Sequence, residues 1–174
     1  TPCTACDGEG RVIVERRLEV DVPAGIHDGQ RIRVRGEGHA GVNGGSRGDV
    51  FVQVRVRPDE RLQRDGDDLV TAVEVTMFQA ALGTTVTLDL PDGPVELEVP
   101  PGTQPGEVRV VRGRGMPSLT TARRGDLRVR VDVAVPQKLD TGARARLEEL
   151  AASLGDDVYR RDDGFFDRLK SSFR

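Results

Sequence analysis

The sequence has no tryptophan, and aromatic residues of any kind make up 3% of its 174 residues. A hydrophobic core must therefore be built from valine and leucine, which favours β-strands. Two cysteines are too few to stabilise a secreted scaffold of this size. No apolar run approaches the ~18 residues of a membrane-spanning helix, and the N-terminus lacks the features of a secretory signal. We therefore expect a cytoplasmic, mostly β protein with no membrane contact.

Neither sign of charge dominates, since 26 Lys and Arg face 29 Asp and Glu for a net charge of −3. This balance provides no electrostatic attraction for nucleic acid. The sequence also offers no nucleophile with a paired base, because it has one tyrosine, two scattered histidines and no Ser–His–Asp order. We expect neither an enzyme nor a nucleic-acid partner.

What the sequence does contain is an internal repeat. VDVPAGIHDGQRIRVRGEG at residues 20–38 matches LEVPPGTQPGEVRVVRGRG at residues 97–115, and Pro23 pairs with Pro100 at an offset of 77 (100 − 23). The same offset pairs the two RGD triplets, which begin at Arg47 and Arg124. A register kept through both loops and strands indicates one supersecondary unit used twice.

Each copy of the repeat reads as strands joined by tight turns. Hydrophobic residues alternate with polar ones at residues 20–22, 50–56 and 127–135, the period of a half-buried strand. Asp-Gly pairs at residues 65–66 and 92–93 predict turns, and residues 78–82 predict a short helical turn. About thirty strand-like residues, 67–96, precede the second copy. The matching strands of the first copy are expected upstream of Thr1.

After Pro136 the period changes to that of a helix. Asp140 or Thr141 is the expected N-cap, and leucines follow at helical spacing at positions 147, 150 and 154. The last residues carry an apolar stripe of Phe165, Phe166, Leu169 and Phe173. This stripe either packs on its own domain or docks on a second protomer; a short, weakly basic membrane-surface helix is a third alternative.

The segment CTACDGEG places Cys3 and Cys6 at the spacing of two ligands of one tetrahedral zinc ion, followed by glycines suited to a tight knuckle. A zinc site needs four ligands, and the chain has no other cysteine. The pair is therefore a zinc half-site completed elsewhere, a redox motif without its usual βαβ context, or two inert cysteines.

Together these features resemble the C-terminal half of a zinc-containing (type I) DnaJ co-chaperone. The resemblance rests on the CxxCxGxG motif and on four further stretches: LEVDVPAGIHDGQRIRVRGEG (18–38), GDVFVQVRVRPDERLQRDGDDL (48–69), AALGTTVTLDLPDG (80–93) and RGRGMP (112–117). It covers essentially the whole chain.

The resemblance has implications for metal and partners. Family members carry four CxxCxGxG motifs, of which the first and fourth share one zinc ion, and CTACDGEG resembles the fourth. We expect Zn²⁺ in the full-length protein and weak or absent zinc in this chain, with Cys3 and Cys6 as the half-site. The implied partners are unfolded client polypeptides, a DnaK-type chaperone with its nucleotide exchange factor, and a second copy of the chain. No His-Pro-Asp triplet of a J-domain occurs, so we expect no stimulation of a DnaK-type ATPase.

The resemblance also implies where clients bind. Unfolded segments dock in apolar grooves of the two β domains, often by adding a strand at a sheet edge. The residues that match the groove of the first domain are Leu18, Val20, Val50 and Val52. The repeat suggests Val95, Leu97, Leu127 and Val129 in the second. The alternative is that all eight are ordinary core residues. The phenylalanine stripe matches the family's C-terminal dimerisation segment.

We therefore predict a mostly β fold of two consecutive sandwich-like domains with a helical C-terminus. The expected parts are a zinc-region remnant (1–11), an incomplete first β domain (12–63), a second β domain (64–136) and a dimerisation segment (137–174). The predicted function is client binding for delivery to a DnaK-type chaperone. The alternatives are an assembly module that binds one folded partner, and a zinc-dependent nucleic-acid binder, against which the net charge counts.

Two further motifs are interpreted as structural. GEGHAG at residues 36–41 spells G-x-G-x-x-G, but a dinucleotide site needs a helix next, and here a loop leads to another strand. RGRG at 112–115 corresponds to RGEG in the first copy, so the two copies share the glycines and not the second charge. We expect turns at both places.

Overall fold

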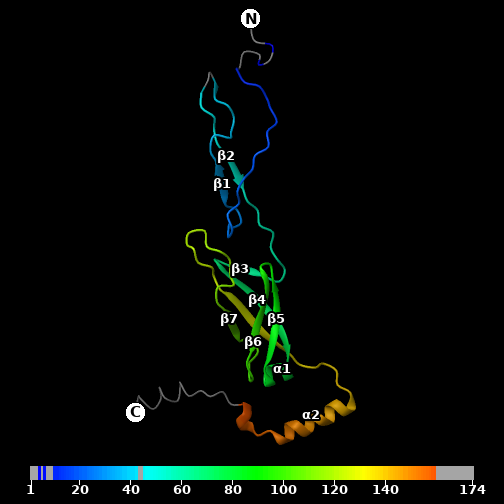
Figure 1. Cartoon of the computed structure of the whole chain (residues 1–174). Coiled ribbons are helices and arrows are strands. Elements are labelled where there is room, and N and C mark those ends of the chain that lie inside the picture. The colour runs from blue at the N-terminus through cyan, green and yellow to red at the C-terminus, as the bar shows by residue number, and fades with distance from the viewer. Residues whose placement is uncertain (1–3, 5, 7–9, 43–44, 160–174) are drawn as a thin grey trace, which may run out of the picture. The chain divides into compact units, whose positions relative to one another are not determined.

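The computed structural model describes residues 4, 6, 10–42 and 45–159. The chain divides into two compact units, residues 1–134 and 135–174. The first unit holds both copies of the repeat and all of the assigned strands, so the prediction of a mostly β fold is confirmed (Figure 1). The four-part domain division remains a prediction.

The second copy contains two sheets. The larger has the strand order β3-β4-β8-β7, built from β3 (Gln63–Asp65), β4 (Asp68–Thr76), β8 (Leu127–Ala134) and β7 (Val108–Val111). Strands β4 and β8 are parallel, and the other pairs are antiparallel. The smaller sheet is a hairpin of β5 (Thr84–Leu90) and β6 (Gly93–Val99).

The core lies between these two sheets. Alternate side chains of β4, β6 and β8 point inward, which is the period-two pattern expected from the sequence. On β8, Leu127, Val129 and Val131 have no exposed surface at all. The core is aliphatic throughout, as the scarcity of aromatic residues predicts: Val73, Val75, Ala80, Leu90, Val95, Leu97, Val99, Leu127, Val129 and Val131.

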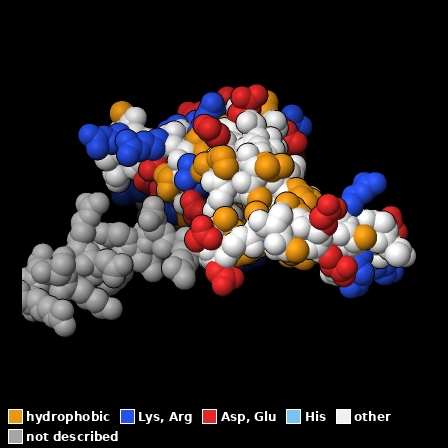
Figure 2. Space-filling view, turned by 90° about the horizontal axis from the view of Figure 1, so that it is seen from below, with side chains coloured by type: hydrophobic (Ala, Val, Ile, Leu, Met, Phe, Trp, Pro, Cys, Tyr) orange, Lys and Arg blue, Asp and Glu red, His pale blue; other side chains and the backbone are white. Residues whose placement is uncertain are grey.

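Turns and a short helix connect these strands as the local sequence dictates. Gly66 and Gly93 have φ of 63° and 117° in the two Asp-Gly turns, backbone angles that favour glycine. The predicted helical turn is α1 (Met77–Leu82), which begins with a capping box in which Thr76 and Gln79 bond each other's backbone N–H. Figure 2, which is seen from below the view of Figure 1, shows hydrophobic side chains at the surface with acidic ones beside them.

The first copy contains a counterpart of the β7–β8 pair. Strands β1 (Arg31–Val34) and β2 (Val50–Gln53) form an antiparallel pair whose register matches that of β7 and β8 at the offset of 77. Its turns match as well: Gly29 N–H donates to the Val54 carbonyl at 2.9 Å, and Gly106 N–H to that of Val131 at 2.8 Å. The prediction that one unit is used twice is confirmed.

One expectation for the first copy is wrong. Residues 20–22 alternate as a strand would, but the structure assigns no strand anywhere in residues 11–22. Their counterparts in the second copy belong to β6, which forms by pairing with β5. Among the described residues, no strand pairs with the 11–22 segment. Alternation alone cannot stabilise an extended chain whose backbone groups lack a pairing partner.

Arg64 of β3 joins the two copies. Its Nη1 and Nη2 donate to the carbonyl oxygens of Ile26 and Gly25, at 2.8 and 2.7 Å, and its Nε donates to that of Gly66 at 2.7 Å. Nη2 also lies 3.0 Å from Nε2 of His27. One half-buried guanidinium thus connects the turn of the first copy with the β3–β4 hairpin of the second.

The second unit holds α2 (Thr141–Ser153) and a 3-10 helix, η2 (Asp156–Tyr159). Of the two expected N-caps, the structure selects Asp140, whose carboxylate accepts from Ala143 N–H at 2.7 Å. The stripe of Phe165, Phe166, Leu169 and Phe173 lies outside the described residues. In the part of the chain that is described, no helix has the length and apolar character needed to cross a membrane.

Candidate functional site

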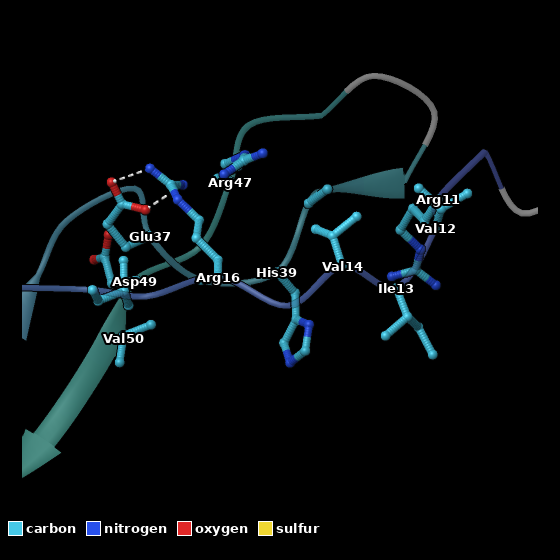
Figure 3. A pocket seen from close by; sticks show the side chains of 13 residues that line it. Arg11, Val12, Ile13, Val14, Arg16, Glu37, His39, Arg47, Asp49 and Val50 are labelled. Atoms are coloured by element: carbon cyan, nitrogen blue, oxygen red, sulfur yellow. Dashed lines mark hydrogen bonds and ion pairs between the residues drawn. The ribbon is translucent and has the colours of Figure 1, made fainter.

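A groove of about 690 Å³ opens in the first copy of the repeat. One wall is the extended segment 11–18, and the other is formed by residues 37–40 and 47–50 around the start of β2 (Figure 3). Its apolar lining comes largely from Val12, Ile13, Val14, Leu18 and Val50. Ile13 is fully exposed, and Val12 and Val14 are 60% and 70% exposed. The groove is therefore an open strip of β-branched and leucine side chains in contact with solvent.

An ion pair holds the two walls together. Arg16 Nη1 lies 2.5 Å from Glu37 Oε2, and Nη2 donates to Oε1 at 3.3 Å (Figure 3). The second wall is folded by close backbone approach, because Gly38 N–H donates to the Gly48 carbonyl at 2.8 Å. A Cβ at Gly38 would lie 2.7 Å from the carbonyl carbon of Gly48, so the position requires glycine.

Asp49 completes the second wall. Its Oδ1 accepts from Gly36 N–H at 2.8 Å, and its Oδ2 accepts from Arg33 Nε at 2.6 Å. The backbone hydrogen bond from Gly36, followed by the bond from Arg33, lowers the pKa of Asp49 below its ordinary value of 3.8. The carboxylate is therefore ionised at neutral pH and committed to the turn.

The structure brings two of the four predicted first-copy residues into this groove. Leu18, 36% exposed, and Val50 both line it. Val20 and Val52 are partly buried and do not line it; Val52 faces Ile32 across the β1–β2 pair. Whether any of the four contacts a client remains a prediction.

The predicted residues of the second copy lie elsewhere. Leu97 is 4% exposed and Val129 is fully buried, and the suggested Val95 and Leu127 also belong to the core. Val95 and Leu97 lie on the inward face of β6, and Leu127 and Val129 lie on the inward face of β8, so all four side chains pack in the core. For these four, the alternative of ordinary core residues describes the structure. Whether any of them contacts a client remains a prediction.

Sequence reasoning missed Val12, Ile13 and Val14. Three consecutive β-branched residues show no alternation, so the period-two search passed over them. The available signal was a run of apolar residues without a predicted partner strand, which indicates exposed hydrophobic surface.

The described residues do not form a metal centre. Cys3 lies outside them, and no described group of three or more His, Cys, Asp or Glu could hold an ion. Two thiolates from one CxxC provide half of a tetrahedral set. The described donor set does not fit zinc, and the weak or absent zinc binding expected for this chain remains a prediction.

The remaining motifs have structural roles. The G-x-G-x-x-G stretch at 36–41 lies in the β1–β2 connection, which has no α-helix among its described residues. Gly36 and Gly113 both have a φ near +70°, at 70° and 69°, and each donates its N–H to the Asp of the RGD triplet, Asp49 or Asp126, at 2.8 Å. The shared glycines and aspartates therefore build the same turn twice.

Comparison with known proteins identifies the family that this fold and groove belong to. The family model described as "DnaJ C terminal domain" matches residues 8–136, and the chain belongs to that family. The resemblance drawn from the motifs is thus confirmed.

Among its relatives, the chain is 44% identical to "Chaperone protein DnaJ 1" of Mycolicibacterium paratuberculosis, over 99% of this chain and 47% of that protein. It is 43% identical to "Chaperone protein DnaJ" of Ruminiclostridium cellulolyticum, over 99% and 49%. It is 44% identical to the protein of that name from Listeria monocytogenes serotype 4a, over 99% and 46%. The chain spans about half the length of these relatives. They are named chaperones, and the family is one of chaperones rather than enzymes.

Proposed function

We propose that this chain binds extended segments of unfolded polypeptide, as the client-binding part of a DnaJ-type co-chaperone. The observation that supports the proposal most is the open groove of the first copy, whose valine and isoleucine side chains are largely solvent-exposed. Contiguous exposed apolar side chains of this kind favour contact with another polypeptide segment. Apolar contact is non-directional, so it suits clients of many sequences.

Delivery of clients to a DnaK-type chaperone and its exchange factor is the finer part of the proposal. It rests on family membership, because the relatives are DnaJ chaperones about twice as long as this chain. In this scheme the chain holds the client, and the remainder of the co-chaperone contacts the ATPase.

The test is co-elution with a reduced, permanently unfolded protein in size-exclusion chromatography with light scattering. We expect the chain to co-elute with the unfolded protein and not with its native form. Leu18→Asp, in the groove, should reduce co-elution several-fold, because it places a charge among apolar contacts. The matched control Leu82→Asp alters a leucine of α1 that is 78% exposed and outside the groove.

Binding to one folded protein in a fixed ratio would instead support the assembly-module alternative. Equal effects of the two leucine variants would contradict the groove assignment. A chain that ignores unfolded proteins altogether would contradict the proposed function.

We further propose that the stripe of Phe165, Phe166, Leu169 and Phe173 pairs two chains, which would raise avidity for a long client through effective concentration. Light scattering should then give a dimer mass for the native chain and a monomer mass for Phe166→Asp. Ser171→Asp, which places the same charge on a polar position of that segment, should leave the dimer intact. A native chain of monomer mass would overturn this proposal.

A further inference from the structure

The groove carries an uneven charge distribution. Three arginines and two carboxylates line it: Arg11, Arg16, Arg47, Glu37 and Asp49. Both carboxylates are already bound within the chain. Glu37 forms the ion pair with Arg16 that joins the two walls. The charge of Glu37 is thus neutralised by an arginine of the same chain.

Asp49 is bound more completely than Glu37. Arg33, which does not line the groove, contacts its Oδ2 through both Nε and Nη2, at 2.6 and 2.5 Å, while Gly36 N–H occupies Oδ1. The lowered pKa of Asp49 reflects the same contacts. Neither groove carboxylate therefore needs a further cation.

Arg47 is different. Its side chain is exposed on the wall of the groove, and among the described residues it has no hydrogen-bond or ion-pair partner. Figure 3 draws dashed lines between Arg16 and Glu37 and none to Arg47. The wall thus presents one guanidinium whose donors are not occupied by any described residue of the chain.

The repeat provides an internal comparison. The counterpart of Arg47 is Arg124, 77 positions later, and both residues open an RGD triplet. Arg124 is held in place, since its Nη2 donates to Asp92 Oδ2 at 2.8 Å and to the Gly115 carbonyl at 2.9 Å. The same position is therefore a structural contact in the second copy, whereas in the first copy the arginine has no partner among the residues that the structure describes.

From this charge complementarity we propose that Arg47 makes the groove selective for client segments that carry an aspartate or glutamate beside their apolar residues. The apolar strip binds the valine- and leucine-like side chains, and Arg47 pairs with the neighbouring carboxylate. This inference rests on the proposed function, and it defines the chemical class of the segments that the groove prefers.

The test uses three short fluorescent peptides with one shared core of leucine and valine, flanked by aspartate, serine or lysine. Anisotropy titrations at low salt should show the aspartate peptide binding about two- to five-fold more tightly than the serine peptide, the range for an exposed ion pair. The lysine peptide should bind most weakly. High salt should compress these differences, because exposed ion pairs are screened.

Variants assign the effect to one residue. Arg47→Gln should abolish the preference for aspartate, and Arg47→Glu should reverse it in favour of lysine. Since Arg47 has no partner in the described chain, neither change removes a contact of the fold, and circular dichroism would verify this. The matched control is Arg57→Glu, an exposed arginine of the same copy that does not line the groove.

The outcomes separate the two proposals. If all three peptides bind wild type equally, the selectivity inference is overturned while client binding stands. If none binds, the proposed function fails. If Arg57→Glu erases the preference as fully as Arg47→Glu, net charge and not Arg47 sets it, and the inference is again overturned.

Discussion

Asp49 and Asp126 occupy equivalent positions in the two copies of the repeat and make equivalent hydrogen bonds. Each accepts a hydrogen bond from the backbone N–H of a glycine with positive φ, Gly36 or Gly113, at 2.8 Å. The RGD triplet and the RGEG or RGRG stretch are therefore two halves of one turn. This explains why both recur at an offset of 77 although they lie about ten residues apart.

Replacing either aspartate should reduce the protection from hydrogen exchange only in the turn of its own copy. In Asp49→Ala, the Gly36 amide should exchange with solvent faster, since it loses its acceptor, while the Gly113 amide keeps its protection. Asp126→Ala should give the reverse pattern. Residue-resolved hydrogen exchange measures both amides in one experiment. Loss of protection at both glycines in either variant would contradict this local role.

The first of these turns should also respond to acid. Because hydrogen bonds hold the pKa of Asp49 below 3.8, the carboxylate stabilises the folded turn fully above that value. The contribution is lost as pH falls through the lower, folded-state pKa. Protection of the Gly36 amide, measured from pH 5 downward and corrected for intrinsic exchange, should therefore decline with acid. In Asp49→Asn this decline should be absent; an equal decline in both proteins would contradict the assignment.

At the scale of elements, the two copies meet through a turn and not through a sheet. Gly25 has a φ of 88°, and a Cβ there would lie 1.9 Å from the carbonyl oxygen of Pro117 in the second copy. Its counterpart Gly102 has a φ of 81° and nothing within 4 Å of that Cβ position. Gly25 thus combines a backbone requirement with a contact between copies, whereas Gly102 has the backbone requirement alone.

This pair predicts unequal effects of one substitution. Gly102→Ala should cost about 1–2 kcal/mol from the left-handed backbone. Gly25→Ala should cost more and should also separate the turn from Pro117 and Arg64. Urea unfolding measures the cost, and hydrogen exchange at residues 26–30 reports the separation. If both variants lose the same free energy of unfolding and exchange at residues 26–30 is unchanged in both, the contact between the copies does not contribute to stability.

Alternation and turn residues predicted most of the second copy correctly. The Asp-Gly turns, the helical turn after Thr76 and the alternation of β8 each depend on neighbours in sequence, so local pattern sufficed. The 11–22 segment shows the limit of this approach. Its residues Leu18, Val20 and Val22 alternate with polar residues as regularly as the hydrophobic residues of β6 do, but a strand also needs a paired backbone, which the pattern does not report.

The sequence predicted only part of the groove lining, because local pattern also does not report which side chains become buried. Of the first-copy residues that the resemblance implies, Leu18 and Val50 line the groove, whereas their contact with a client remains a prediction. The resemblance also suggested Leu97 and Val129 through the repeat, which assumes that equivalent positions have equivalent surroundings. The β5–β6 hairpin breaks that equivalence. In the second copy Leu97 of β6 is buried in one core with Val129 of β8, while the first copy has no such hairpin among its described residues. Burial is a tertiary property, and a repeat in sequence does not transmit it.

At the scale of the molecule, the buried valines and leucines are concentrated in the second copy, and the first copy exposes its own. All of the described core residues lie between Val73 and Val131. The first copy instead leaves Phe51 and Val56 about half or more exposed, besides the valines of the groove. The second copy therefore contains the buried core, and the groove lies in the less buried copy of the same unit. Such a division suits a binding surface that must adapt to many segments.

If this division is correct, core changes in the second copy should govern global stability. Leu127→Ala removes a side chain with no exposed surface and should lower the free energy of unfolding by about 2–5 kcal/mol. Leu82→Ala, at a leucine that is 78% exposed, should change it by about 0.5 kcal/mol or less. Urea denaturation followed by circular dichroism provides both values. Client binding by folded Leu127→Ala at low temperature should match wild type, because the groove lies in the other copy. If that variant remains folded but binds clients more weakly, the groove depends on the packing of the second copy's core, which would contradict this division.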